Sequence, residues 1–260
     1  MTERVPFIAG NWKMNLDHLQ AIALIQKLCW TLNDADHDWD KVEVSVFPPF
    51  TSLRSAQTLI EAERFEVRLG AQDISAQESG AFTGEVSGSM LAKLDAKYVL
   101  IGHSERRQYH GEGDELVQAK VAAAFKHGIT PVICVGETLE ELEAQGQSAV
   151  PVAQTIAALS GHEQLADFII AYEPVWAIGT GKVATPKEAE DVASAIRQAL
   201  RDNFGEEAAN ARILYGGSVK ANNVAGFLQS PEVDGVLVGG ASLDAEEFAG
   251  ISRFQKHIVL

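Results

Sequence analysis

The sequence predicts an α/β protein in which eight parallel strands close into a (β/α)8 barrel enclosed by helices. Three observations support this fold class. Short apolar segments alternate with segments of helical periodicity along the whole chain. There are eight such pairs, and α/β barrels of about 260 residues are ordinarily one domain, so we expect residues 1–260 to form a single domain. A doubly wound open sheet is the alternative, because it shows the same alternation.

Each predicted strand is a short apolar run that ends at a proline, a glycine or a polar residue. The run 168–172 is apolar enough to be a parallel strand buried on both faces. It ends at Glu173-Pro174, because proline has no N–H to donate to a neighbouring strand. In chain order, the predicted strands are Phe7–Gly10, Val42–Phe47, Val67–Ala71, Tyr98–Ile101, Pro131–Val135, Phe168–Tyr172, Ile213–Tyr215 and Val236–Val238.

The predicted helices have apolar residues every three or four positions and capping residues at their ends. One stripe consists of Leu19, Ile22, Ile25, Leu28 and Leu32, and another of Leu116, Val121 and Phe125. Thr185-Pro186-Lys187-Glu188 is a capping box with proline at the first helical position. In chain order, the predicted helices are Asp17–Leu32, Ser52–Ala62, Ser87–Leu94, Asp114–His127, Thr138–Leu159 with a break at Gly146, 186 to about 203, Asn222–Leu228 and Ala245–Phe254.

The composition argues against several classes of partner. The chain has 21 Lys and Arg against 36 Asp and Glu, a net charge of −15, which argues against binding to nucleic acid or to an anionic membrane. Two cysteines, Cys29 and Cys134, are too few for a disulfide framework, which favours a reducing compartment. The sequence shows no signal-peptide pattern and no apolar run of membrane-spanning length, so we expect a soluble cytoplasmic protein.

Polar residues and glycines follow five of the predicted strands. In a barrel, the carboxyl ends of all strands meet at one face, where ligands bind. A site in so acidic a chain would need its own local positive charge to bind a phosphate. The residues gathered at this face are Asn11 and Lys13 after the first strand, His103 and Glu105 after the fourth, Glu173 after the sixth, Gly217 and Ser218 after the seventh, and Gly239 and Gly240 after the eighth.

These residue types suit one class of reaction. Glu173 can act as a base, and Lys13 supplies a positive charge. His103 precedes a predicted helix start, where free N–H groups disfavour a charged ring, so a neutral imidazole can donate a hydrogen bond to a substrate oxygen. The glycine pairs expose backbone N–H groups suited to phosphate. We therefore predict proton abstraction next to a carbonyl, through an enediolate, on a small phosphorylated substrate, with no metal ion and no cofactor.

The segment after Glu173 is predicted to be a loop that closes over a ligand. It carries two bulky apolar residues, Trp176 and Ile178, between glycines and a proline, and an exposed loop gains nothing from such residues unless they cover something. A G-x-G-x-x-A pattern begins at Gly179. We reject it as a dinucleotide site, because no strand runs directly into it and the following helix begins too late.

The same segments identify a family. The chain resembles the triosephosphate isomerases along its whole length and in the family's order. The resemblance implies interconversion of dihydroxyacetone phosphate and D-glyceraldehyde 3-phosphate, a step of glycolysis and gluconeogenesis, without a cofactor. The matching motifs are NWKMN (11–15), IGHSERR (101–107), AYEPVWAIGTGK (171–182), YGGS (215–218) and VGGASL (238–243).

The resemblance also implies roles and a partner. Glu173 is expected to move the proton between two substrate carbons, His103 to be the neutral electrophile, and Glu105 to be an accessory carboxylate. The family is usually a homodimer whose third loop inserts into the partner, and the matching loop is Gln72–Val86. The residues expected to hold the substrate are Asn11, Lys13, Gly179, Ser218, Gly239 and Gly240, and those expected at the dimer contact are Thr83 and Phe82.

Two other functions are compatible with parts of the pattern. Another phosphate-binding barrel enzyme, an epimerase or a lyase, would need a metal site or a Schiff-base lysine inside a strand, and neither is visible. A non-catalytic binding protein on the same fold would be expected to have lost Glu173, Lys13 or His103, and all three are present. Taken singly, each glycine could also be only a tight turn, and Lys13 only a solvated charge.

Overall fold

The computed structural model describes residues 4–162, 164–177 and 183–257. Eight parallel strands are hydrogen-bonded in sequence order, and β8 pairs with β1, so the sheet is a closed barrel. This confirms the predicted fold class and excludes the open sheet. The strands are β1 (Phe7–Asn11), β2 (Glu43–Phe47), β3 (Arg68–Ala71), β4 (Tyr98–Ile101), β5 (Thr130–Val135), β6 (Ile169–Tyr172), β7 (Arg212–Tyr215) and β8 (Gly235–Val238).

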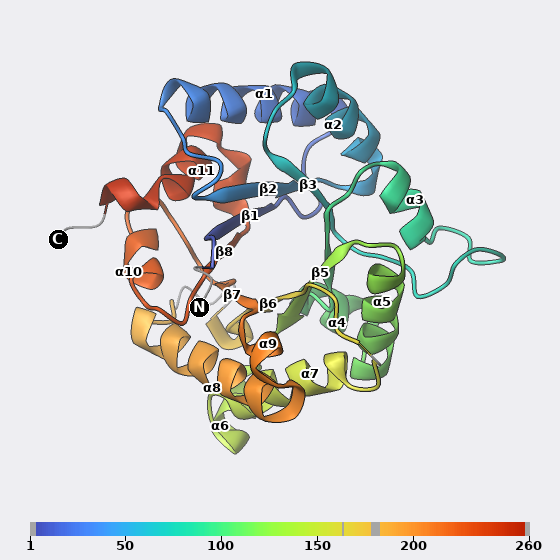
Figure 1. Cartoon of the computed structure of the whole chain (residues 1–260), viewed down its shortest axis with the longest axis vertical. Coiled ribbons are helices and arrows are strands. Elements are labelled where there is room, and N and C mark those ends of the chain that lie inside the picture. Colours follow the sequence, from blue (N-terminus) through green and yellow to red (C-terminus); the bar gives the residue numbers. More distant parts are fainter. Residues whose placement is uncertain (1–3, 163, 178–182, 258–260) are drawn as a thin grey trace.

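The helices surround the strands (Figure 1). Sequence periodicity did not find α9 or the three 3-10 turns, because elements of three or four residues make only about one helical turn, in which no repeat can be seen. The helices are α1 (His18–Asp34), α2 (Phe50–Glu63), α3 (Gly88–Lys93), α4 (Ser104–His110), α5 (Asp114–Lys126), α6 (Leu139–Gln145), α7 (Ala149–Leu159), α8 (Pro186–Phe204), α9 (Glu206–Ala209), α10 (Val224–Leu228) and α11 (Ala245–Ser252), and the 3-10 turns are η1 (Val175–Ala177), η2 (Gly240–Leu243) and η3 (Phe254–His257).

The predicted capping box at the start of α8 is present, and both predicted apolar stripes are buried or partly buried except for one leucine in each. The Thr185 hydroxyl accepts the Glu188 N–H at 3.2 Å, and the Glu188 carboxylate accepts the Thr185 N–H, which is the predicted capping box. Leu19 and Leu116 were expected to face the core, yet they are 65% and 40% exposed. Alanines fill part of the inner face of α1 and α5, and the buried residues there are Ala21, Ile25, Leu28, Cys29 and Leu32 in α1 and Val117, Lys120, Val121, Ala123 and Ala124 in α5.

The barrel has two apolar layers, one inside the strands and one between strands and helices. Inside, large and small side chains alternate across facing strands: the Phe47 ring fills the space beside Gly70, where an added Cβ would lie 2.2 Å from it. This packing brings the carboxyl ends of the strands to one mouth. The interior layer is formed by Phe7, Ala9, Phe47, Tyr98, Leu100, Val132, Cys134, Ile169, Ala171, Leu214 and Leu237.

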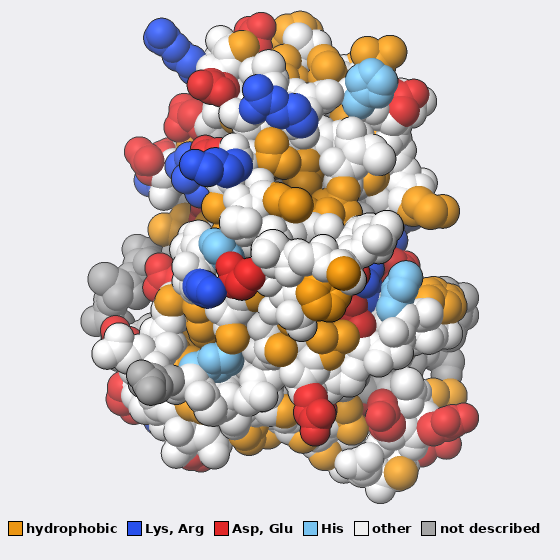
Figure 2. Space-filling view, turned by 90° about the vertical axis from the view of Figure 1, so that its right-hand side faces the viewer, with side chains coloured by type: hydrophobic (Ala, Val, Ile, Leu, Met, Phe, Trp, Pro, Cys, Tyr) orange, Lys and Arg blue, Asp and Glu red, His pale blue; other side chains and the backbone are white. Residues whose placement is uncertain are grey.

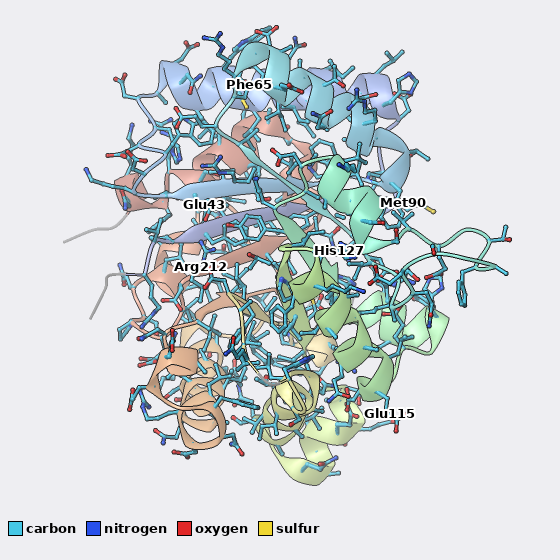
Figure 3. The ribbon with its side chains drawn as sticks, turned by 45° about the vertical axis from the view of Figure 1, so that its right-hand side comes forward. Glu43, Phe65, Met90, Glu115, His127 and Arg212 are labelled. Carbon is cyan, nitrogen blue, oxygen red and sulfur yellow. The ribbon has the colours of Figure 1, made fainter. Side chains whose placement is uncertain are left out.

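The loop between β3 and α3 extends away from the barrel (Figures 1 and 3). Its base is closed by a hydrogen bond from the Ser75 N–H to the Val86 carbonyl at 2.8 Å. Hydrophobic side chains gather on the face from which it projects (Figure 2), and Phe82 near its tip is 45% exposed. None of the helices in the described ranges is long and apolar enough to cross a membrane.

Candidate active site

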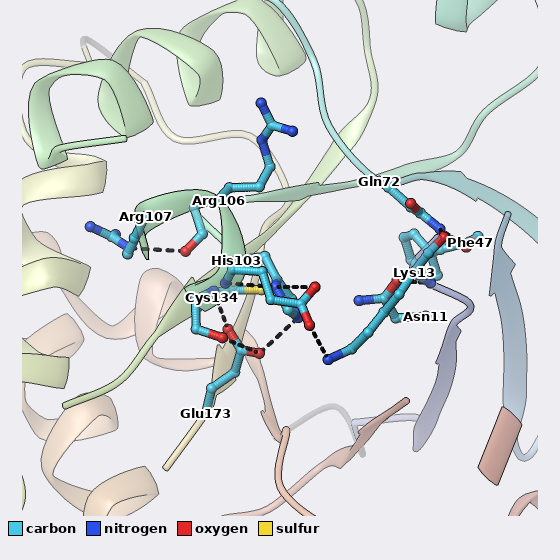
Figure 4. Close-up of polar contacts among 12 residues, drawn as sticks. Asn11, Lys13, Phe47, Gln72, His103, Arg106, Arg107, Cys134 and Glu173 are labelled. Atoms are coloured by element: carbon cyan, nitrogen blue, oxygen red, sulfur yellow. Dashed lines mark hydrogen bonds and ion pairs between the residues drawn. The ribbon is translucent and has the colours of Figure 1, made fainter. Parts of the chain in front are cut away.

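Strand ends deliver the site residues to one mouth of the barrel. Asn11 is the last residue of β1, His103 follows β4 and precedes α4, and Glu173 follows β6. These side chains are buried at 4%, 5% and 3% exposure, and they face a cavity of about 270 Å³ (Figure 4). The cavity is lined by Asn11, Lys13, His103, Glu173, Gly216, Gly217, Ser218, Val219, Lys220, Leu237, Gly239, Gly240 and Ala241.

Glu173 is bound at both carboxylate oxygens. His103 Nε2 lies 2.9 Å from Oε1, the Ser104 N–H donates to Oε2 at 2.9 Å, and the Ser104 hydroxyl donates to Oε1 at 3.3 Å. Burial alone would raise the pKa of Glu173, but His103 and the Ser104 N–H favour the carboxylate and hold its pKa below the ordinary value. Glu173 is therefore a buried carboxylate that stays ionised near neutral pH.

His103 is oriented by the helix that follows it. Its Nδ1 accepts the Glu105 N–H at 3.2 Å, so the ring proton lies on Nε2 and points at Glu173. This is the tautomer expected of a neutral donor. Burial lowers the pKa of His103, but the adjacent Glu173 carboxylate raises it more, so the pKa lies above the ordinary value in this arrangement. The predicted neutral ring thus depends on Glu173 leaving its present contact.

Lys13 is held in a strained backbone conformation. Its φ is +53°, in the left-handed region that side chains other than glycine rarely adopt. The Lys13 N–H donates to Asn11 Oδ1 at 3.0 Å, and its carbonyl accepts from Gln72 Nε2 at 2.8 Å. The ammonium donates to Glu105 Oε1 at 2.6 Å. Glu105 is not among the residues that line the cavity, so its link to the site is this contact with Lys13.

Another part of the cavity wall is formed by the backbone that follows β7 and β8. Gly217 must be glycine there, because an added Cβ would lie 2.2 Å from the Tyr215 hydroxyl. Within the described part of the chain, the N–H groups of Ser218, Gly239 and Gly240 donate to no protein acceptor. Unpaired N–H groups that line a cavity can bind a phosphate. Gly179, the fourth residue predicted for this role, lies outside the described residues.

Known proteins resemble this chain over almost its whole length. A family model described as triosephosphate isomerase matches residues 6–255. The chain belongs to the triosephosphate isomerase family. It is 62% identical to the triosephosphate isomerase of Leifsonia xyli subsp. xyli, over 98% of this chain and 99% of that protein, and 55% identical to that of Streptomyces coelicolor, over 98% and 99%. The crystal structure of the Bartonella henselae triosephosphate isomerase superposes with a TM-score of 0.85 at 36% identity, covering 96% of this chain and 99% of that one.

The structure of this triosephosphate isomerase family member shows a second buried carboxyl, Glu137, which was not predicted from the sequence. Glu137 is fully buried and accepts hydrogen bonds from the Tyr172 hydroxyl at 2.8 Å and from Trp176 Nε1 at 2.9 Å. Burial raises its pKa to about 7. Glu137 follows β5 at the same mouth, so the strand-end rule that selected Glu173 could have found it. Ser104 was also passed over, although it lies inside the IGHSERR motif.

Arg106 has a structural role in this family member. Arg106 contacts Asp73 at 2.9 Å and Glu112 at 2.7 Å. Lys120 of α5 contacts the same two carboxylates, and its side chain is 4% exposed. These contacts tie α4, α5 and the start of the 72–86 loop together. Among the described residues, no group of three or more His, Cys, Asp or Glu side chains could hold a metal ion.

Proposed function

We propose that this protein interconverts dihydroxyacetone phosphate and D-glyceraldehyde 3-phosphate by proton transfer through an enediolate, without a cofactor. One observation carries the proposal. Glu173, His103 and Lys13 line the same cavity of about 270 Å³, and the backbone that lines it presents the unpaired N–H groups of Ser218 and Gly239. A base, a hydrogen-bond donor, a cation and a phosphate cradle are what this reaction needs.

Glu173 is proposed to remove a proton from one substrate carbon and return it to the neighbouring carbon. The electron pair of the broken C–H bond forms the C=C bond of the enediolate, and the negative charge develops on the former carbonyl oxygen. The contacts of Glu173 with His103 and Ser104 must be exchanged for contacts with substrate, because both oxygens are occupied. His103 Nε2–H then donates to the substrate oxygen, and the His103 pKa falls once the carboxylate has left.

The other predicted residues are proposed to hold the substrate. Lys13 and Asn11 bind near the reacting carbons, and Glu105 acts as an accessory carboxylate that positions the Lys13 ammonium through their 2.6 Å contact. The phosphate is bound by N–H groups at the ends of β7 and β8. The residues proposed for the phosphate are Gly179, Ser218, Gly239 and Gly240.

The functional unit is proposed to be a cytoplasmic homodimer of single-domain chains spanning residues 1–260, with no nucleic acid or membrane as partner. The Gln72–Val86 loop would insert into the second copy, with Phe82 buried in the contact and Thr83 directed toward the partner's site. The exposed Phe82 and the projection of the loop from the barrel support this (Figure 3). Analytical ultracentrifugation combined with an activity assay tests the proposed homodimer, and a fully active monomer at micromolar concentration would contradict it.

A coupled assay on the purified chain tests the proposed reaction. The wild type is expected to isomerise both triose phosphates. Glu173→Gln is expected to lose about 10³-fold or more in kcat, because the amide cannot accept the proton, and Glu173→Asp to lose less, because the carboxylate is retained but set back. Full activity of the Gln variant, or an inactive wild type, would refute the proposal.

A further inference from the structure

We propose that Lys220 supplies a second positive charge at the phosphate end of the active site and strengthens binding of the anionic substrate. The inference rests on the proposed function and adds a residue to it. Lys220 lies two positions after Ser218, and it lines the same cavity as Glu173, His103 and Lys13. It comes from the connection that follows β7, whereas Lys13 comes from the connection that follows β1, two strands away around the barrel.

The backbone that carries Lys220 is fixed relative to the proposed phosphate donor. The Lys220 N–H donates to Asn223 Oδ1 at 2.8 Å, and Asn223 Nδ2 donates to the Ser218 carbonyl at 3.3 Å. The Lys220 carbonyl accepts the N–H groups of Asn223 and Val224 at 3.1 and 3.0 Å. The next residue is held by a hydrogen bond from its N–H to Glu247 Oε1 at 2.9 Å. The side chain therefore starts from a defined point beside the cavity, while its exposed ammonium can follow a ligand.

Charge balance singles out Lys220. The chain carries a net charge of −15, so its overall field repels a phosphate dianion. Lys13 and Lys220 are the lysines among the described residues that line the cavity, and the third basic side chain there, His103, is in contact with Glu173. Lys13 is already paired with Glu105 at 2.6 Å, whereas the Lys220 ammonium forms no ion pair within the described ranges. Lys220 thus offers positive charge that no protein carboxylate there neutralises.

The position of Lys220 predicts an effect on binding and not on chemistry. Lys220 lines the cavity together with the residues proposed to bind the phosphate. Because the phosphate keeps its charge through the reaction, Lys220 would stabilise the bound substrate and the transition state equally. Such uniform binding lowers KM and leaves kcat unchanged. Because the side chain is exposed, its field is screened by salt, with a Debye length of about 30 Å at 0.01 M ionic strength and about 8 Å at 0.15 M.

The test compares Lys220→Gln with Lys27→Gln, which makes the same change of net charge at an exposed ion pair between α1 and α11. At about 0.01 M ionic strength, Lys220→Gln is expected to raise KM for glyceraldehyde 3-phosphate about threefold to tenfold, with kcat within about twofold, and the effect should shrink at about 0.15 M. Lys220→Arg should restore KM, because the charge returns. Isomerisation of D-glyceraldehyde, which lacks the phosphate, should be the same in all variants.

Calorimetric titration with inorganic phosphate supplies a readout that needs no catalysis. Weaker phosphate binding by Lys220→Gln than by Lys27→Gln supports the inference. Equal KM and equal phosphate affinity in the two variants at low ionic strength would overturn it and leave the proposed reaction intact. A loss of kcat, or an equal loss with D-glyceraldehyde, would also overturn it. An inactive wild type would instead refute the proposed function, and the phosphate titration would still decide the role of Lys220.

Discussion

The two mouths of the barrel both carry charged and polar side chains, and the carboxyl-terminal mouth also has backbone N–H groups without a hydrogen-bond acceptor among the described residues. At the carboxyl-terminal mouth, Glu173, His103 and Lys13 surround a cavity of about 270 Å³ that also exposes unpaired backbone N–H groups. At the amino-terminal mouth, Glu43 and Arg212 line a cavity of about 520 Å³. The larger cavity is therefore at the end where barrels carry stability and not chemistry. Cavity volume does not identify the site here.

The polar groups at the amino-terminal mouth satisfy one another. Arg212 Nη1 donates to Glu43 Oε2 at 2.6 Å, and the Tyr98 hydroxyl donates to Glu43 Oε1 at 2.6 Å. The guanidinium also stacks 4.7 Å from the centre of the Phe7 ring. Burial, together with the adjacent Glu43, raises the pKa of Tyr98 to about 12, so it remains a donor at any physiological pH. The difference teaches that open hydrogen-bonding capacity, and not charge alone, marks the functional end.

The largest expected effect is on activity, from removing the cation at the carboxyl-terminal mouth. Lys13→Met should lower kcat/KM about 10²-fold to 10³-fold, because a preorganised positive donor is lost beside the developing charge. The free energy of unfolding should change by less than about 1 kcal/mol, since the Lys13–Glu105 pair is 32% and 43% exposed. Steady-state kinetics and urea denaturation measure the two effects, with Lys27→Met as control. If Lys13→Met lowers the free energy of unfolding but keeps the wild-type kcat/KM, Lys13 has a structural role and the contrast between the two mouths is wrong.

Removing the cation at the amino-terminal mouth should have the opposite signature. Arg212→Met leaves Glu43 without its main partner and removes the stacking on Phe7, so the free energy of unfolding should fall by about 2–4 kcal/mol. The kcat should remain within about twofold of wild type at a temperature where the variant is folded. Arg201→Met, which breaks an exposed pair with Glu206, should cost less than about 1 kcal/mol. Loss of kcat with unchanged stability would show that this mouth takes part in function.

The smallest effect concerns Glu137, the buried carboxyl at the functional mouth. Its pKa is about 7 in the folded protein and about 4.3 when unfolded, so between these values the folded state binds more protons. Stability from this group is complete below pH 4.3 and is lost as the pH rises through 7. Glu137→Gln should therefore reduce the fall in thermal midpoint between pH 5 and pH 8 by about 2–4 °C. Glu140→Gln, an exposed neighbour, should follow wild type, and identical slopes in all three proteins would refute the assignment.

Sequence reasoning succeeded where the signal is local. The carboxyl end of β6 follows from Pro174, and the start of α8 follows from the capping box at Thr185. Each of these signals acts within a few residues. It failed at Leu19 and Leu116, where the apolar residue chosen for the stripe faces outward and alanine faces inward. Alanine fits either environment, so its direction is not encoded in periodicity alone.

The candidate site divides in the same way. The residue types and their places at strand ends were available from the sequence, as was the position of Glu173. The contact of Glu105 with Lys13 was not, because it joins segments 92 residues apart. The left-handed backbone of Lys13 was not either, because residues other than glycine rarely adopt it. The burial of Lys120 between two carboxylates contradicts the usual fate of lysine and requires partners from β3 and α4 connections.

By itself, the sequence determined the order of the eight strands, the start of α8 at its capping box and the strand-end positions of Asn11, Lys13, His103 and Glu173. Closure of the barrel decided which of those side chains touch, which charges neutralise one another and which remain open to a ligand. The physical reason is range. Periodicity and capping act between neighbours in the chain, whereas pairs such as Glu43 and Arg212, 169 positions apart, exist only when folding brings them within hydrogen-bonding distance.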